Sequence, residues 1–206
     1  MYDIIDKSIE EVTMPSFNIH LAVAVKYCEK NNIKNKNDFF MGSIAPDLVE
    51  DKSQTHYTGF RDKNFLKEFL FQKVRLNEFA KNEKLDSDYQ YGVFLHLATD
   101  FMFFNDLLDS NYIENSTHDD FTQDLYYSYN LTNSYLEEKY NIHELNLDEI
   151  MNNNIKNTLK KNNIDNTKGN DILPKDKLEN FIERLSNLDV KKYFEKVKKE
   201  DKNIFP

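Results

Sequence analysis

Apolar residues recur at helical spacing along most of this chain. The pattern is clear between residues 63 and 81, where the apolar positions lie near one helix face: Phe65, Phe69, Leu70, Val74, Leu76 and Phe79. Comparable patterns predict further helices over residues 20–29, 38–45, 89–108, 119–140, 147–159, 175–185 and 190–199. Ser16 or Asn18 is expected to cap the first of these. Residues 51–59 are predicted to form a loop.

The helix predicted over residues 89–108 differs from the others. Between Val93 and Phe104, apolar residues occupy every face of the helix rather than one stripe. A helix of this kind is buried on all sides, so we expect it at the centre of the fold. The same stretch contains His96, Thr99 and Asp100. It is therefore too short and too polar to be a transmembrane segment.

The composition favours an all-α protein. Four glycines and four prolines leave few residues for the tight turns that many short strands require. A length of 206 residues suits a single domain with one continuous core. We therefore expect one compact multi-helix bundle over residues 1–206, with residues 1–13 as an N-terminal extension. The stretch 152–170 is rich in Asn and Lys and is expected to form a flexible loop.

Charge and cysteine content narrow the range of partners. The formal net charge of -9 argues against binding to a nucleic-acid backbone, because such binding depends on clustered Lys and Arg. The single cysteine, Cys28, cannot form an internal disulfide. Residues 1–13 are acidic and lack the apolar core of a signal peptide, so we expect a cytoplasmic protein.

His96 and Asp100 are the first candidates for chemistry. They stand four residues apart in the apolar helix, so both side chains project from the same face about one turn apart. A buried carboxylate is costly unless it is paired, hydrogen-bonded or bound to a metal. The two residues therefore form either a hydrogen-bonded pair in the core or part of a metal site. Their spacing alone fits both interpretations.

Three further residues favour the metal site. His20 begins an apolar helix, Asp47 directly follows a proline, and His56 lies in a predicted loop. Taken singly, they fit a core or capping histidine, a helix cap or turn, and an exposed histidine. Imidazole and carboxylate groups together are the usual ligands of zinc and iron. The three residues, considered with His96 and Asp100, favour a shared metal.

Four short motifs occur in the order found in zinc-dependent phospholipase C-like proteins, which are related to bacterial phospholipase C and the S1/P1 nucleases. They are MPSFNIH at 14–20, GSIAPD at 42–47, TH at 55–56 and FLHLATD at 94–100. The sequence resembles this family over about residues 14–140. The resemblance implies a helical bundle of the phospholipase C and P1 nuclease type, with metal ligands at His20, Asp47, His56, His96 and Asp100.

The sequence also departs from the family pattern. The family's N-terminal tryptophan ligand has no counterpart, because this chain contains no Trp. Asp106 stands where the family has a histidine, and His118 is followed four residues later by Thr122 instead of Glu. Asp106 and His118 are kept as candidate ligands, although capping and surface charge explain them equally well. We expect one tightly held divalent metal, zinc before others, and a second, weaker one near His20.

These observations predict a hydrolase of phosphoric esters that uses a metal-activated water. The resemblance implies that Asp47 ligates the metal weakly and accepts a proton from the attacking water. The expected substrate is a small-molecule or lipid phosphoester. Two alternatives remain: an HD-type phosphohydrolase, based on the dipeptide His118-Asp119, and a degenerate non-enzymatic metal-binding or interaction protein, based on the missing ligands.

Overall fold

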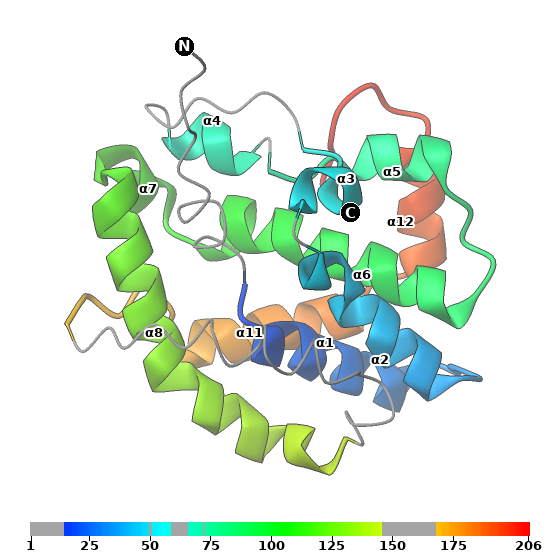
Figure 1. The fold of residues 1–206 in the computed structure, drawn as a ribbon, viewed down its shortest axis with the longest axis horizontal. Coiled ribbons are helices and arrows are strands. Elements are labelled where there is room, and N and C mark those ends of the chain that lie inside the picture. Colours follow the sequence, from blue (N-terminus) through cyan, green and yellow to red (C-terminus); the bar gives the residue numbers. More distant parts are fainter. Residues whose placement is uncertain (1–14, 50, 59–65, 72, 146–167) are drawn as a thin grey trace.

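Helices account for every regular element in the part of the chain that the structure describes. The computed structural model describes residues 15–49, 51–58, 66–71, 73–145 and 168–206, without the side chains of residues 68 and 69. No strand occurs in these residues, which confirms the predicted all-α fold (Figure 1). The elements near the site are α1 (Phe17–Lys30), α2 (Lys36–Ile44), the short helix η2 (Ala45–Leu48), α3 (Lys52–His56) and α6 (Asp88–Met102).

The remaining helices surround α6, which crosses the middle of the bundle (Figure 1). They are α4 (Leu66–Phe71), α5 (Leu76–Asn82), the π-helical turn η3 (Phe103–Leu107), α7 (Ser110–Asn115), α8 (His118–Lys139), the short η4 (Ile142–Glu144), α11 (Lys175–Ser186) and α12 (Val190–Val197). All residues of α6 from Gly92 to Met102 are buried. The central buried helix expected from the sequence is thus confirmed, and it begins where the Ser87 side chain accepts a hydrogen bond from the Gln90 amide.

Two glycines let α2 and α6 approach more closely than other residues would allow. A Cβ atom on Gly42 of α2 would lie 2.1 Å from the carbonyl oxygen of Tyr89. A Cβ atom on Gly92 of α6 would lie 2.2 Å from the carbonyl oxygen of Phe39. Both contacts involve backbone, which cannot move aside as a flexible side chain can. The close crossing brings the backbone of α2 within hydrogen-bonding distance of side chains on α6.

The single helix predicted over residues 63–81 is wrong, because the described part of this segment forms two helices, α4 and α5. Between them, the Arg75 amide donates to the carbonyl of His56 at 3.0 Å. The side chain of Asn203 accepts from the Leu76 amide at 2.8 Å and donates to the Val74 carbonyl at 2.5 Å. Partners distant in sequence therefore satisfy the backbone groups that a continuous helix would use.

The loop predicted over residues 51–59 is also corrected. Residues Lys52–His56 form the one-turn helix α3, and the Asp51 side chain caps it by accepting a hydrogen bond from the Ser53 amide at 3.1 Å. A helix this short has no repeated apolar spacing, so the hydrophobic pattern could not reveal it. The helix predicted over residues 147–159, the extension 1–13 and nearly all of the loop predicted over 152–170 lie outside the described residues.

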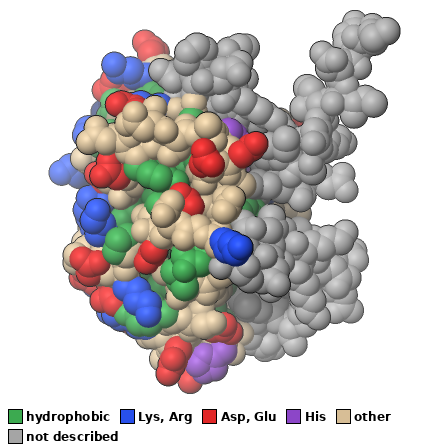
Figure 2. Space-filling model, turned by 90° about the vertical axis from the view of Figure 1, so that its left-hand side faces the viewer, with side chains coloured by type: hydrophobic (Ala, Val, Ile, Leu, Met, Phe, Trp, Pro, Cys, Tyr) green, Lys and Arg blue, Asp and Glu red, His purple; other side chains and the backbone are tan. Residues whose placement is uncertain are grey.

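The face around α7 and α8 carries a mixed surface. Acidic, basic and apolar side chains are interspersed there (Figure 2). In the described helices, no run of residues is long and apolar enough to cross a bilayer.

Candidate metal centre

The five principal ligand candidates come together in one buried cluster. His20 is on α1, Asp47 on η2, His56 at the end of α3, and His96 and Asp100 on α6. The exposed fraction of these residues is between 0% and 4%. Four separate segments therefore deliver three imidazoles and two carboxylates to the same place. We call this group the His/Asp cluster.

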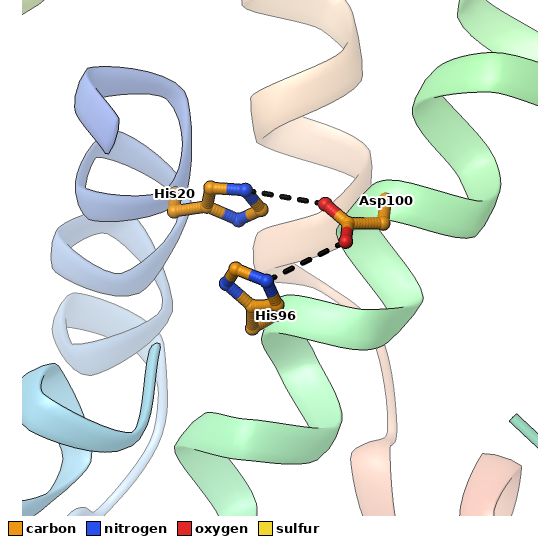
Figure 3. Close-up of side chains that lie close together, drawn as sticks. All are labelled: His20, His96 and Asp100. Atoms are coloured by element: carbon orange, nitrogen blue, oxygen red, sulfur yellow. Dashed lines mark ion pairs between the residues drawn. The ribbon is translucent and has the colours of Figure 1, made fainter. Parts of the chain in front are cut away.

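Asp100 lies between the three histidines. Its Oδ1 is 3.2 Å from His20 Nε2, whereas its Oδ2 is 3.0 Å from His56 Nε2 and 3.4 Å from His96 Nε2. Figure 3 shows the two oxygens directed towards His20 and His96. The rings of His20 and His96 stack with centroids 3.9 Å apart. The two oxygens of the Asp100 carboxylate thus lie next to different histidines.

Asp47 lies near the same three histidines, at longer distances. Its Oδ1 is 3.6 Å from His56 Nε2, and its Oδ2 is 3.8 Å from His20 Nε2 and 3.9 Å from His96 Nε2. α2 ends at Ile44, because Pro46 has no amide hydrogen with which to continue the helical hydrogen bonds, and the chain continues as η2. The Thr55 hydroxyl donates to the Pro46 carbonyl at 2.9 Å. This bond holds η2 against α3, and so holds Asp47 near His56.

Backbone carbonyls orient two of the imidazoles. His96 Nδ1 lies 2.8 Å from the carbonyl oxygen of Ser43, and His56 Nδ1 lies 3.1 Å from that of Lys52. A carbonyl only accepts, so each Nδ1 carries the proton and donates it. In the neutral ring, Nε2 is then left with its lone pair directed into the cluster. This is the arrangement that histidine ligands of metals ordinarily adopt.

The spacing of the donor atoms fits a metal ion. His56 Nε2 and His96 Nε2 are 3.3 Å apart, and they are 3.0 Å and 3.4 Å from Asp100 Oδ2. Zinc–nitrogen bonds of about 2.0–2.1 Å in a tetrahedral site place neighbouring ligands about 3.3 Å apart. Both ring nitrogens of His20, Oδ1 of Asp47 and both oxygens of Asp100 are buried without a partner of hydrogen-bond geometry. A cation would satisfy these atoms.

Two overlapping groups in the cluster could hold an ion. One consists of His20, His96 and Asp100, and the other of Asp47, His56 and His96. All members are buried, so either group would bind its ion away from bulk water. The groups share His96, which places this residue at the centre of the site.

The charges of the cluster suit a cation. Burial would raise the pKa of Asp100, but His96 and its contacts with His20 and His56 hold that pKa well below the usual value. Burial would also raise the pKa of Asp47, which Lys52 and His96 instead lower. Both carboxyl groups are therefore ionised at neutral pH. Ionised carboxylates are the form in which aspartate binds metals.

The histidines are affected in opposite directions. Burial, followed by the charge of His96, lowers the pKa of His20. Burial also acts to lower the pKa of His96, but the charges of Asp100 and Asp47 outweigh it and raise that pKa. In the metal-free cluster, His96 is thus the histidine that stays protonated most readily. A metal that binds His96 has to displace this proton.

Asp106 and His118 do not join the cluster. Asp106 forms an ion pair with Arg184 of α11, and both side chains are partly exposed. His118 begins α8, where its Nδ1 is 3.9 Å from the exposed carboxylate of Asp119. Neither belongs to the groups that could hold an ion in the described part of the chain. Of the seven ligand candidates, five therefore lie in the cluster.

Two residues that contact the cluster, and a buried tyrosine whose pKa the cluster raises, were not predicted from the sequence. Lys52 places its Nζ 3.3 Å from Asp47 Oδ1, and Ser43 supplies the carbonyl that orients His96. Tyr129 of α8 is buried, and burial together with the charges of Asp100 and Asp47 raises its pKa well above 10. Of the three, only Lys52 could have been inferred from the sequence, because it lies four residues before His56, which is one helical turn.

Comparisons of this chain with protein-family models, with curated proteins and with solved structures found no match. The relation to the phospholipase C-like family therefore stays a prediction from the four sequence motifs. A cavity of about 450 Å³ lies elsewhere, between α7, the start of α8 and residues Gly169 and Asn170, and is lined by no residue of the His/Asp cluster.

Proposed function

We propose that the protein is a metal-dependent hydrolase of phosphoric esters. The observation that carries the proposal is the buried His/Asp cluster, in which His56, His96 and Asp100 present donor atoms at the spacing of a zinc site. Asp47 adds a second carboxylate beside them. The order of the four motifs, which resembles that of zinc-dependent phospholipases C, supports this reaction class.

In this proposal, different residues of the chain bind the metal ions, accept the proton and orient the histidines. Asp47, His56, His96 and Asp100 would hold the principal ion, and His20 with Asp100 Oδ1 would hold a weaker second one. A divalent ion there supplies an acidified water and polarises a phosphoryl oxygen. Asp47 is an ionised carboxylate beside Lys52, and it can accept the proton that the attacking water loses. The carbonyls of Ser43 and Lys52 keep the imidazoles in the donor orientation.

A structural metal site is the second candidate, and the burial of the cluster favours it. All five residues are at most 4% exposed. Structural zinc sites are closed, whereas catalytic sites keep a position open for water or substrate. A structural ion would stabilise the crossing of α1, α2 and α6 without catalysing a reaction. By contrast, the separation of His118 from the cluster gives the HD-type alternative no support.

Metal analysis combined with an activity screen tests the proposal. Protein purified without added metal is analysed for bound elements. It is then assayed with p-nitrophenyl phosphate and bis(p-nitrophenyl) phosphate before and after treatment with chelator. We expect hydrolysis of at least one ester, loss of activity in chelator and recovery on addition of zinc. The variants Asp100→Asn and Asp47→Asn separate the roles: the first should lose metal, and the second should retain most of it yet hydrolyse the ester about 10²–10⁴-fold more slowly.

The control for these variants changes a histidine outside the cluster. His143→Ala removes an exposed histidine outside the His/Asp cluster, whose Nδ1 lies 3.4 Å from the carbonyl of Glu137, so activity and metal content should stay unchanged. Tight zinc without hydrolysis of any phosphoester would favour the structural site. Protein that neither contains metal nor binds added zinc would rule out both functions.

A further inference from the structure

Lys52 is the one lysine or arginine in the described part of the chain that forms an ion pair with the His/Asp cluster. Its Nζ lies 3.3 Å from Asp47 Oδ1. Among the ion pairs of the described residues, no other lysine or arginine is paired with a member of the cluster. The side chain of Lys52 is 18% exposed, whereas that of Asp47 is 3% exposed. Lys52 therefore reaches from the solvent to the buried donors.

The segment that carries Lys52 also connects the cluster with an exposed position of the described chain. Val49, between Asp47 and Lys52, is 39% exposed. The other side of the cluster is formed by α1 and α6, whose residues around His20, His96 and Asp100 are buried. Lys52 and Asp47 are therefore the residues that link the buried donors to this exposed segment.

The charges of the site then select the kind of ligand. One divalent ion balances the two carboxylates of the cluster, and neutral histidines add no charge. Lys52 is left as an uncompensated positive charge beside the ion, in surroundings where partial burial strengthens electrostatic interactions. The ammonium group offers three donors and no acceptor, which suits oxygen atoms of an anion. A neutral ester would leave this charge without a partner.

We propose that Lys52 is the anion-binding residue of the site and that it selects ligands with a negatively charged phosphoryl group. The inference rests on the proposed function, since it assumes that a metal occupies the cluster. In the metal-free protein, Asp47 is the partner of Lys52. In the loaded protein, Lys52 becomes available to a phosphoryl oxygen held next to Asp47.

Titration with inorganic phosphate tests this role without relying on turnover. Wild type and the variants Lys52→Gln, Lys52→Arg and Lys81→Gln are loaded with zinc, their metal content is measured, and phosphate is titrated in by calorimetry. Lys81 of α5 is the control, because it forms a lysine–aspartate pair of similar length with Asp201, at 3.2 Å, on the exposed surface. We expect Lys52→Gln to hold zinc but to bind phosphate at least about tenfold more weakly, as expected for loss of a charged hydrogen-bond donor. Lys52→Arg should recover most of the affinity, and Lys81→Gln should resemble wild type.

Three results would overturn the inference. If zinc-loaded Lys52→Gln binds phosphate like wild type, or if loaded wild type binds no phosphate, then Lys52 serves only as a partner of Asp47. If both Lys52 variants lose zinc, Lys52 is part of the support for the metal rather than the anion site. Failure of the proposed function is separate from these results, because it is seen as an absence of zinc in wild type before any phosphate is added.

Discussion

At the residue scale, His96 is the most constrained member of the His/Asp cluster. Its Nδ1 is held by the Ser43 carbonyl, and its Nε2 lies within 3.4 Å of both His56 Nε2 and Asp100 Oδ2. Two nitrogen atoms that face each other at this distance cannot both use their lone pairs unless a proton or a cation lies between them. Any change that removes a positive charge from the cluster is therefore expected to destabilise it.

Removal of one ligand should cost stability as well as metal. In His96→Ala the carboxylate of Asp100 loses its first counter-charge, and in Asp100→Ala three imidazoles lose the group that links them. Breaking a buried charged pair typically costs about 3–5 kcal/mol. Urea denaturation with zinc and with chelator measures the effect, and His143→Ala should stay within about 0.5 kcal/mol of wild type. A buried metal site would be contradicted if chelator leaves the stability of wild type unchanged and both variants unfold at the wild-type urea concentration.

The opposite pKa shifts of His20 and His96 predict a stability maximum near pH 6.5 for the metal-free protein. Burial and His96 lower the pKa of His20 below 6.5, so between that lowered pKa and 6.5 the unfolded chain binds more protons and stability rises with pH. The charges of Asp100 and Asp47 raise the pKa of His96 above 6.5 against the effect of burial. Above 6.5, the folded protein therefore binds more protons, and stability falls as pH rises through the raised pKa.

Zinc should remove the decline on the alkaline side. A bound metal keeps His96 unprotonated in the folded state, so the folded protein no longer gains from a proton there. Urea midpoints between pH 5 and 8, measured in chelator and in zinc, compare the two profiles. A metal-free profile that continues to rise above pH 6.5 would show that the carboxylates do not control His96.

At the scale of elements, the crossing of α2 and α6 determines the orientation of His96. The Gly42 and Gly92 contacts allow the two backbones to approach, and the Ser43 carbonyl of α2 thereby reaches Nδ1 on α6. The short helix α3 has the same role for His56 through the Lys52 carbonyl. Backbone carbonyls thus orient both candidate ligands, His96 through the neighbouring α2 and His56 through its own helix α3.

A methyl group at the crossing should weaken both the fold and the site. Gly42→Ala or Gly92→Ala places a Cβ atom about 2 Å from a backbone oxygen, so the helices must separate. We expect a loss of at least about 1–3 kcal/mol in the free energy of unfolding, with weaker zinc binding in the protein that still folds. Lys36→Ala, at an exposed position of α2, is the control and should change neither. Wild-type stability and zinc affinity in both glycine variants would contradict the close approach.

At the scale of the whole molecule, the site depends on contacts between segments far apart in sequence. The carbonyl of His56 accepts from the Arg75 amide, and Asn203 near the C-terminus completes the hydrogen bonds of Val74 and Leu76. These bonds connect α3, the start of α5 and the C-terminal segment. The stability of the site is therefore tied to the folding of the chain as a whole rather than to one helix.

The two environments of Asp100 predict unequal metal sites. Oδ2 faces His56 and His96, with Asp47 nearby, whereas Oδ1 faces only His20 within 3.2 Å. A metal at the first position would have four protein ligands, and one at the second would have His20 and a shared carboxylate. Sites with few protein ligands usually bind weakly. Isothermal titration of the stripped protein should show one tight zinc and a second that exchanges readily and disappears in His20→Ala.

Two outcomes would contradict this stoichiometry. Three equally tight ions would mean that residues outside the His/Asp cluster, such as Asp106 or His118, complete another position. Two equal ions that both persist in His20→Ala would show that His20 is not a ligand. Metal analysis of the same samples, performed after dialysis, distinguishes bound from exchangeable zinc.

The sequence by itself determined the fold class and the central helix. Helical periodicity is local, because residues three and four positions apart share a face, and the all-round apolar stretch 93–104 required burial whatever surrounds it. The same local logic placed His96 and Asp100 on one face. The scarcity of His in the chain and the order of the motifs then brought His20, Asp47 and His56 into the predicted site.

Only the tertiary structure decided how these residues meet and which candidates stay apart. The break between α4 and α5, the helical turn of α3 and the ion pair of Asp106 with Arg184 all depend on partners distant in sequence or on a turn too short to be periodic. The positions of Lys52 and of the Ser43 carbonyl follow from packing between helices. Hydrophobic spacing records which face of a helix is buried, but it does not record which backbone or side chain that face will meet.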